Sequence, residues 1–527
     1  MVSLVGNEVV QVTGVVRGSL ASKTEQATTA QIAGLAMSGA AGGILPLANG
    51  GTGNSPWLRA LKCAASYRKN NLVINGTSTT NGSATSPGTA PSTTGMTNLL
   101  PSNGAALSLT AGATTAGSAT ITVASTTNVY PNMWVFENNA SGGPLQANIA
   151  TGSKVVSVLS PTQLLLSKPA LATNTGLALR CASQNMKYIG GVPVSVGGNT
   201  ILGGATNTAA SPSYAIPPSA IEFDTDAANF NTATASIILQ VYQGGGVNAS
   251  YRVAIDGVYT AAATTTGSTG SAYIAITLAT AGVHRVRIEW AINSTYAAYM
   301  IALYLVNNAK IWYPRDLIYK PRYCGFGDSY SAYGGQGFGH DQIIPTFCNL
   351  LGWDFGLCAQ GGTGYVSPGG TNFAWTSPYR ATDTTFDAYD IIGFYGSVND
   401  NGQTAGAIQA AALQTWQNVR TKNPTTPFLI FGVNQTNTVS LATAQTMEGA
   451  LQAAFTQWGD SNAVFIPVST DPTTNAWIDA TNVTTYIMGA SDNTHPTSTG
   501  LNLGGQAFLA AEMANRASNA LSQVVLI

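Results

Sequence analysis

The chain has 527 residues, of which 45% are hydrophobic and only 8% are charged, and its formal net charge is −1. This length indicates several domains, and the hydrophobic fraction excludes an intrinsically disordered chain. The near-neutral charge gives no electrostatic support for a nucleic-acid partner.

The cysteines and the first residues further narrow the class of protein. The five cysteines form no CxxC pair, which predicts buried free thiols rather than a disulfide framework or a metal site; they are Cys63, Cys181, Cys324, Cys348 and Cys358. The chain opens without the basic start and apolar core of a signal peptide. No apolar run approaches the ~18 residues of a membrane helix, so no membrane insertion is expected.

Residues 1–107 are predicted to be an attachment region and a linker. The stretch "TEQATTAQIAGLA" (24–36) favours a short helix. The tract "NGTSTTNGSATSPGTAPSTTG" (75–95) is typical of a loop or linker. Because residues 1–107 hold little periodic pattern, we expect them to attach the protein to a larger structure.

The middle of the chain is predicted to be β-rich. Residues 108–182 alternate with period two, as in "SKVVSVLSPTQLLLSKPA", which indicates a small β-module. Residues 183–318 hold short strands at regular spacing without long helices between them. That pattern indicates a β-sandwich with jelly-roll connections.

Residues 319–527 are predicted to form an α/β domain with a parallel sheet. Short apolar runs such as "DAYDIIGFYGS" and "TPFLIFGVN" alternate with helical patterns such as "TAGAIQAAALQTWQNVRTK". The charge also changes sign, since residues 321–527 have a net charge of −8 and residues 1–320 a net charge of +7. Ligands of such sheets bind at the carboxyl ends of the strands.

A serine follows the first of these strands, in "YCGFGDSYSAYGGQG". Glycines on both sides of "DS" permit a tight turn that would expose Ser329, as a nucleophile requires. The alternative is a Gly/Asp/Ser loop without chemistry.

The chain has three histidines, so a general base is easy to search for. His284 lies inside a strand and His340 in a loop, and structural roles are favoured for both. His495 lies in the polar loop "SDNTHPTSTG", three residues after Asp492. A serine hydrolase needs a base and a carboxylate that orients it, and this loop offers both. An ordinary Asp-rich turn is the alternative.

Two further strand ends offer donors for an oxyanion hole. The glycines of "CAQGGTGYV" let a backbone amide approach a ligand closely, and "GFYGSVNDNG" contains the neutral side-chain amide of Asn399. A Gly-rich turn and an Asn-Asp helix cap are the alternatives. Four independent loops do not explain well why all four segments follow in order.

These segments resemble the blocks of the SGNH (GDSL-type) hydrolase family. "GDSY" resembles the first block and implies Ser329 as the nucleophile, with its own amide as one oxyanion donor. "QGGTGY" resembles the second block and implies Gly364 as another donor. "GSVND" resembles the third and implies Asn399, and "DNTHP" resembles the last and implies Asp492 and His495.

The resemblance covers roughly residues 320–520 and has two departures. The asparagine usual in the second block is absent, so Gly362 is a rival to Gly364. One more residue than usual separates Gly396 from Asn399. Neither departure removes a catalytic group.

The rest of the chain resembles two further arrangements. A jelly-roll module before such a domain is similar to carbohydrate esterases of this superfamily. "LVGNEVVQVTG", "TEQATTAQIAGLA" and Thr/Ala/Gly-rich β-modules resemble bacteriophage tail fibres and tailspikes, which assemble in the cytosol, leave by lysis and are usually homotrimers. This resemblance implies a virion location, with other tail proteins as partners of the N-terminal region.

The resemblances together imply a tail fibre or tailspike that removes O-acetyl groups from a host surface polysaccharide. Four aromatic residues near the blocks could stack on sugar rings: Tyr330, Tyr365, Trp375 and Tyr379. No metal or cofactor is needed. The alternatives are a non-enzymatic fibre that uses the fold as an adhesin, and a bacterial surface or secreted esterase.

Overall fold

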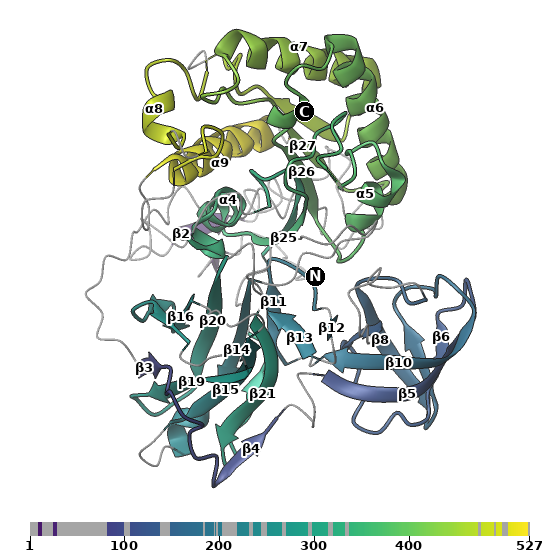
Figure 1. Cartoon of the computed structure of the whole chain (residues 1–527), viewed down its shortest axis with the longest axis vertical. Coiled ribbons are helices and arrows are strands. Elements are labelled where there is room, and N and C mark those ends of the chain that lie inside the picture. Colours follow the sequence, from purple (N-terminus) through teal and green to yellow (C-terminus); the bar gives the residue numbers. More distant parts are fainter. Residues whose placement is uncertain are drawn as a thin grey trace.

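The computed structural model in Figure 1 describes residues 82–524 with gaps, and two short strands before them. The gaps are 100–105, 138–147, 183–184, 194, 197–198, 203–218, 231–234, 244–249, 266–269, 293–297, 315–319, 333–336, 371, 473–475, 490–491 and 498–503. The two earlier strands are β1 (Val9–Val12) and β2 (Glu25–Thr28), which pair antiparallel. Cys63 and the remaining positions before residue 82 lie outside the described residues.

Strand β2 corrects one prediction. Residues 24–36 were expected to be helical, yet Glu25–Thr28 pairs as a strand with Val9–Val12. An isolated short helix is only marginally stable, and the threonines of this stretch favour extended backbone. Pairing with a neighbouring strand therefore outweighs the weak helical pattern.

A closed β-barrel occupies residues 106–182, close to the β-module expected at 108–182. Its strand order is β10-β5-β6-β9-β8-β7. Side chains fill the barrel, among them Leu109, Ile121, Leu164 and Leu179. The strands are β5 (Ala106–Thr114), β6 (Thr120–Thr122), β7 (Trp134–Glu137), β8 (Ser153–Ser160), β9 (Gln163–Leu166) and β10 (Asn174–Ala182).

Two antiparallel sheets follow and share one hydrophobic core. The first contains β11 (Lys187–Ile189), β14 (Ala220–Thr225), β16 (Ser250–Ile255), β17 (Val258–Tyr259), β18 (Ala263–Thr264), β20 (His284–Ile292) and β22 (Ile311–Trp312). The second contains β12 (Ser195–Val196), β13 (Asn199–Leu202), β15 (Ile237–Gln243), β19 (Gly270–Leu278) and β21 (Ala298–Val306). A short 3-10 helix, η1 (Ala227–Phe230), lies between β14 and β15. The two sheets form a sandwich, and its jelly-roll connectivity stays a prediction.

The sandwich also includes two strands from outside 183–318. This corrects the prediction that the segment before the barrel is only a linker. Strand β3 (Gly82–Thr85) pairs with β19, and β4 (Met96–Asn98) pairs with β21. The barrel is therefore inserted between strands of the sandwich. Strands this short and polar leave no periodic signal, because each only adds hydrogen bonds at an existing strand.

The C-terminal part is an α/β unit with a five-stranded parallel sheet, as predicted. Its order is β25-β23-β26-β27-β28, and the strands are β23 (Arg322–Gly327), β25 (Asp354–Ala359), β26 (Ile391–Tyr395), β27 (Phe428–Phe431) and β28 (Ala463–Ile466). Helix α4 (Ile343–Leu351) packs with α9 (Gly505–Val524), and α6 (Ala405–Lys422) packs with α5 (Pro378–Asp383) and α7 (Leu441–Trp458). Figure 1 shows the sheet between these two helix groups. Helix α8 (Val483–Tyr486) precedes the loop of His495.

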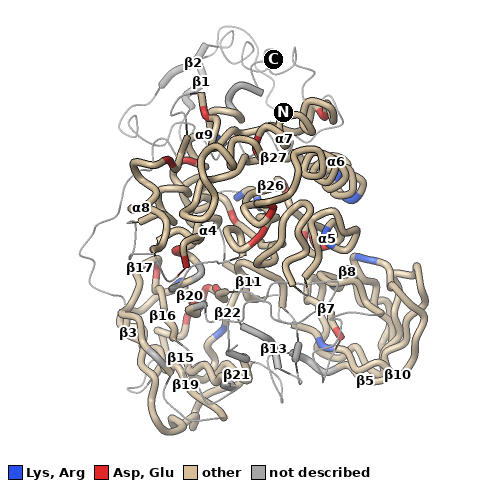
Figure 2. Tube along the Cα trace, turned by 45° about the horizontal axis from the view of Figure 1, so that its top comes forward, with Lys and Arg blue, Asp and Glu red and all other residues tan. Residues whose placement is uncertain are grey.

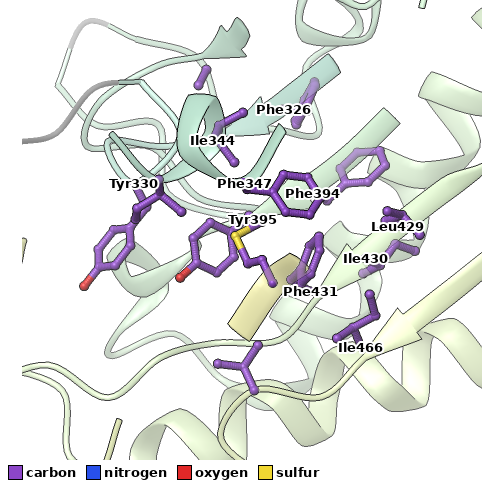
Figure 3. Close-up of a cluster of buried hydrophobic side chains, with 14 of the residues drawn as sticks. Phe326, Tyr330, Ile344, Phe347, Phe394, Tyr395, Leu429, Ile430, Phe431 and Ile466 are labelled. Atoms are coloured by element: carbon purple, nitrogen blue, oxygen red, sulfur yellow. The ribbon is translucent and has the colours of Figure 1, made fainter. Parts of the chain in front are cut away.

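The parallel sheet is buried on both faces, which explains its continuous apolar runs. Every residue of β26 and of β27 is buried. Figure 3 shows the packed side chains of Phe326, Phe394, Ile430 and Phe431 in this core. Each such side chain contributes about 1.5–3 kcal/mol on burial. The carboxyl ends of the strands therefore start from a rigid base.

Charged residues are sparse along the trace (Figure 2), but several meet where the sandwich touches the α/β unit. Arg252 of β16 donates to both carboxylate oxygens of Asp341, at 2.9 and 3.0 Å, and also to Glu289 of β20. Strand β24 (Gly337–Phe338) pairs with β20, and His340 in the following turn, η2 (Gly339–Asp341), contacts Glu289. This buried ionic junction joins the two parts.

Two other predictions can be compared with the described residues. Cys181, Cys324, Cys348 and Cys358 are buried free thiols, as predicted. None of the helices that the structure describes has the length and apolarity needed to span a bilayer.

Candidate active site

Ser329 lies two residues after β23, the second strand of the sheet, at the carboxyl edge. Gly327 ends this strand, and a Cβ placed there would lie 2.2 Å from the carbonyl oxygen of Tyr395. Glycine is therefore required by the close approach of β26, and not by an unusual turn. Strand β23 therefore ends at a buried residue. Ser329 is partly exposed, whereas its neighbours Asp328 and Tyr330 are buried.

The structure brings Ser329, His495 and Asp492 into one hydrogen-bonded relay. Ser329 Oγ lies 2.7 Å from His495 Nε2. The other ring nitrogen, Nδ1, lies 2.7 Å from Asp492 Oδ2 and 2.9 Å from Oδ1. These are the contacts that a serine nucleophile, its base and an orienting carboxylate require.

The loop of His495 holds this geometry through its own backbone. Asp492 also accepts from the amides of Thr494 and His495, and Asn493 between them adopts a left-handed conformation with φ of 61°. Burial alone would raise the pKa of Asp492, but the hydrogen bonds from His495 outweigh it and hold that pKa below its usual value. Asp492 therefore stays ionised next to the imidazole.

A buried carboxylate precedes the nucleophile. Asp328 is fully buried and accepts hydrogen bonds from the amides of Tyr330 and Ser397, at 2.9 and 2.7 Å, and from Asn399 Nδ2 at 3.2 Å. Burial raises the pKa of Asp328 to about 7. Asp328 ties the turn of Ser329 to the loop after β26.

A second buried carboxylate shapes the loop after β25. Asp400 accepts from the amides of Tyr365, Val366 and Ser367, at 2.7, 3.1 and 2.8 Å. It also accepts from the hydroxyl of Ser397, whose φ of 75° is unusual for a residue other than glycine. Ser397 lies between Gly396 and Asn399, where the third block has one more residue than usual, and it links Asp328 to Asp400.

The structure contradicts the prediction that Gly364 is an oxyanion donor. Its amide donates to the carbonyl oxygen of Ser367 at 2.8 Å, and a Cβ placed on it would lie 2.4 Å from Asp400. Gly364 therefore faces Asp400. Among the residues described, the amides of Gly361 and Gly362 make no hydrogen bond, and a Cβ at Gly361 would lie 3.9 Å from Ser329 Cβ. Gly361 and Gly362 therefore replace Gly364 as the candidates for the second oxyanion donor.

Asn399 lies in the turn η3 (Val398–Asp400), beside the same site. Its Nδ2 donates to the carbonyl oxygen of Thr363 at 2.9 Å and to Asp328 Oδ2 at 3.2 Å. The side-chain amide thus bridges the second-block loop and the residue before Ser329. Both hydrogens of Nδ2 are thus donated within the protein, so an oxyanion would have to take one of them from its present acceptor.

Three of the four aromatic residues predicted to stack on sugar are buried, so that prediction is wrong for them. Tyr330, Tyr365 and Trp375 are exposed by 3% or less. Trp375 Nε1 donates to Thr363, and its ring lies 4.4 Å from that of Tyr365. Tyr330 donates from its hydroxyl to the carbonyl oxygen of Thr494 at 2.6 Å and so supports the loop of His495.

Tyr379 differs from these three because 52% of its surface is exposed. Its ring lies 5.6 Å from that of Phe373. The next residue, Arg380, is buried and donates to the carbonyl oxygen of Gly327 at 3.1 Å. Tyr379 is therefore an exposed aromatic residue anchored close to the strand that carries Ser329.

The remaining histidines have structural partners, as predicted. His284 contacts Asp256 at 2.7 Å and the carbonyl oxygen of Thr280 at 2.8 Å, within the sandwich. His340 belongs to the ionic junction. Over the part of the chain that the structure describes, no group of three or more His, Cys, Asp or Glu side chains could hold a metal ion.

Comparisons with solved structures give carbohydrate esterases and related enzymes as neighbours. A family two carbohydrate esterase from Cellvibrio japonicus is 13% identical, with 65% of this chain and 96% of that chain covered and a TM-score of 0.46. The salicylyl-acyltransferase of a tetracycline biosynthetic pathway is 14% identical over 66% and 97%, with a TM-score of 0.45. An acetyl xylan esterase from the rumen bacterium Butyrivibrio proteoclasticus is 11% identical over 64% and 96%, with a TM-score of 0.42. No protein-family model and no curated protein matches the sequence.

Sequence reasoning missed three contributors to the site: the carboxylates of Asp328 and Asp400, and Ser397 between them. Their signal was present, since a chain with 22 acidic residues in 527 places one beside Ser329 and another beside Asn399. A buried carboxylate needs several donors to offset its desolvation. Both therefore mark points where backbone loops converge.

Proposed function

We propose that the protein is a serine esterase that removes acyl groups, acetyl in particular, from a polysaccharide. The observation that carries this proposal is the relay in which Ser329 Oγ lies 2.7 Å from His495 Nε2 and Asp492 binds the opposite nitrogen. An adhesin that no longer catalyses would not need this geometry, and that favours an enzyme over a purely binding fibre.

The reaction follows from the relay. Ser329 Oγ attacks the carbonyl carbon of the ester while His495 Nε2 takes the hydroxyl proton. When the tetrahedral intermediate collapses, the bond from carbon to the sugar oxygen breaks, and His495 returns the proton to that oxygen. Water, activated by His495, then cleaves the acyl-enzyme to free acid and restores Ser329.

The negative charge of the intermediate needs preorganised donors. We assign this role to the amide of Ser329, to the amide of Gly361 or Gly362, and to Asn399 Nδ2. Asp328 and Asp400 are positioning residues in this scheme, because they hold the loops that carry these donors and do not touch the substrate.

The biological setting remains part of the proposal. Polysaccharide is proposed as substrate because the α/β unit is joined to a β-sandwich and a barrel, and because the chain resembles phage tail fibres in its first residues. In that setting the protein would act at the host surface as a homotrimer held to other tail proteins by residues 1–107. Light scattering on the full chain tests this part separately, since a monomer would contradict it.

Acetate release tests the enzymatic proposal. Purified O-acetylated bacterial polysaccharides and p-nitrophenyl acetate are incubated with the wild type, with Ser329→Ala and with Ser461→Ala, a control at an exposed serine of the same unit. Ser329→Ala should lose about 10⁴-fold or more in kcat, and Ser461→Ala should match the wild type. Equal activity of Ser329→Ala and the wild type would overturn the proposal.

A further inference from the structure

A groove opens between the first turns of α6 and α7. Its volume is about 290 Å³, near the lower end of ordinary ligand pockets at roughly 300 Å³. The two helices pack side by side on one face of the sheet (Figure 1), and alanines at both first turns leave the space open. The groove is lined by Gly402, Gln403, Ala405, Ile408, Ala442, Thr443, Thr446 and Met447.

The groove lies on the same edge of the sheet as the catalytic relay. One wall begins at Gly402, three residues after Asn399. The other wall follows a loop that contacts the loop of His495, because Thr438 Oγ1 lies 3.4 Å from Thr494 Oγ1 and the amide of Asn437 donates to Asn493. Both walls therefore continue directly from segments that border Ser329.

The order of the strands shows on which side of Ser329 the groove lies. Ser329 follows β23, and the groove lies beyond the ends of β26 and β27, the next two strands of the sheet. The groove is lined by α6, by α7 and by the turn before α6, so it lies in the helix layer next to that edge and not within the sheet. Only a substrate of more than one unit can occupy Ser329 and the groove together.

The lining selects the chemistry of the occupant. The floor is apolar, since Ile408 and Met447 are buried, and the rim carries the polar side chains of Gln403, Thr443 and Thr446. An apolar floor with hydroxyl and amide groups at the rim matches a sugar ring, which has an apolar face and hydroxyl edges. An acyl chain would call for an enclosed apolar channel, whereas Gly402, Ala405 and Ala442 leave the groove open to solvent.

The absence of charge in the lining of the groove narrows the class of sugar that it can bind. None of the residues that line the groove is Asp, Glu, Lys or Arg. The caps Thr404 and Ser440 already accept from the amides of Ala407 and Thr443, which reduces what the helix ends can offer an anion. Gln403 has no side-chain hydrogen bond within the described part of the chain and can both donate and accept. These features favour a neutral sugar over a uronic acid.

We infer that the groove between α6 and α7 is a subsite that binds a neutral sugar unit of the polysaccharide whose ester is cleaved at Ser329. This inference rests on the proposed function for its substrate. It predicts a preference for acylated chains of several neutral sugars over acylated monosaccharides or uronic acid polymers.

Paired substitutions on one helix test the subsite. Ala442→Trp fills the groove, and Ala453→Trp places the same side chain at another exposed alanine of α7. We expect Ala442→Trp to lower the ratio of kcat/KM on acetylated xylo-oligosaccharides to kcat/KM on p-nitrophenyl acetate by about tenfold, or roughly 1.4 kcal/mol. Ala453→Trp should keep the wild-type ratio. If the two variants have the same ratio, the inference is wrong.

Binding without turnover separates this inference from the proposed function. In a Ser329→Ala background, calorimetric titration with xylohexaose should show an affinity that Ala442→Trp weakens about tenfold and Ala453→Trp leaves intact. Hexagalacturonic acid should bind more weakly than xylohexaose. Unaltered xylohexaose affinity in Ala442→Trp, or tighter binding of the acidic oligomer, would overturn the subsite. A wild type that binds xylohexaose through the groove but hydrolyses no ester would instead overturn the proposed function alone.

A second pair of substitutions controls for misfolding of the first variant. If Ala442→Trp lowers the thermal midpoint, Ala405→Trp on the opposite wall and its control Ala410→Trp on α6 repeat both measurements. Ala405→Trp should reproduce the loss of affinity for xylohexaose. A loss confined to Ala442→Trp and accompanied by unfolding would count against the subsite.

Discussion

The buried carboxylate of Asp328 accepts a hydrogen bond from the amide of Ser397 at 2.7 Å. This bond joins the residue before the nucleophile to the loop that carries Asn399. Ser397 in turn donates from its hydroxyl to Asp400 at 2.8 Å, and Asp400 holds the loop after β25. Two carboxylates and one serine thus connect all the segments that carry the proposed oxyanion donors.

The pKa of Asp328 predicts a pH-dependent stability. Burial raises this pKa to about 7 from an ordinary 3.8. Between about pH 4 and pH 7 the folded protein therefore binds a proton that the unfolded chain has lost, and stability falls as the pH rises through this window, by up to about 1.4 kcal/mol per pH unit. Above pH 7 this contribution stays constant.

Thermal unfolding of the wild type and of Asp328→Asn between pH 4 and pH 8 checks this expectation. The variant lacks the titrating carboxyl, so the wild-type midpoint should fall relative to that of the variant between pH 4 and 7 and run parallel to it above. A difference that is constant across the range would mean that the donors around Asp328 keep it ionised throughout.

Replacing Asn399 by Ala tests the oxyanion hole. The change removes a neutral donor beside Ser329, so we expect kcat on p-nitrophenyl acetate to fall about 10²- to 10³-fold with little change in KM. It also removes the bonds to Asp328 and Thr363, so the thermal midpoint should be recorded with the kinetics. Full retention of activity would remove Asn399 from the scheme.

The relay was predictable because each of its members follows a recognisable local pattern. Ser329 comes after an apolar strand and between glycines, and Asp492 and His495 share one short loop. Ser329 follows a parallel strand, and the carboxyl ends of such strands meet at one edge. Asp492 and His495 lie instead in a loop after α8, so the family resemblance of that loop was what placed them beside Ser329.

The choice between glycines was not predictable from the same pattern. Whether Gly364 or Gly362 faces the serine depends on the path of the loop after β25. That path is set by Asp400, which accepts the amide of Tyr365 from 35 residues away in the sequence. The prediction that these aromatic residues stack on sugar was wrong for a related reason. A loop position does not reveal that Trp375 packs inward against Tyr365.

Arg252→Ala tests the ionic junction between the sandwich and the α/β unit. Burial opposes the charge of Glu289, but His340 and Arg252 hold its pKa below the usual range. Removal of Arg252 leaves Glu289 and Asp341 without this cation, which should cost roughly 3–5 kcal/mol. Arg285→Ala, which breaks a more exposed pair with Asp224, should cost about 1 kcal/mol or less. Similar thermal midpoints for the two variants would contradict a stabilising role of the junction.

Tyr379→Ala tests the one predicted aromatic residue that is exposed. Tyr379 belongs to α5, which packs against α6, and the next residue, Arg380, bonds the carbonyl oxygen of Gly327 at the end of β23. A sugar stacked on Tyr379 would extend the substrate over α5. Stacking of this kind contributes about 0.5–1.5 kcal/mol. The ratio of kcat/KM on acetylated xylo-oligosaccharides to kcat/KM on p-nitrophenyl acetate should thus fall about 2- to 10-fold.

Tyr313→Ala, at a tyrosine of the sandwich with 50% exposure, is the matched control for Tyr379→Ala. If Tyr379→Ala keeps the wild-type ratio, or if Tyr313→Ala lowers it equally, Tyr379 does not contact the substrate.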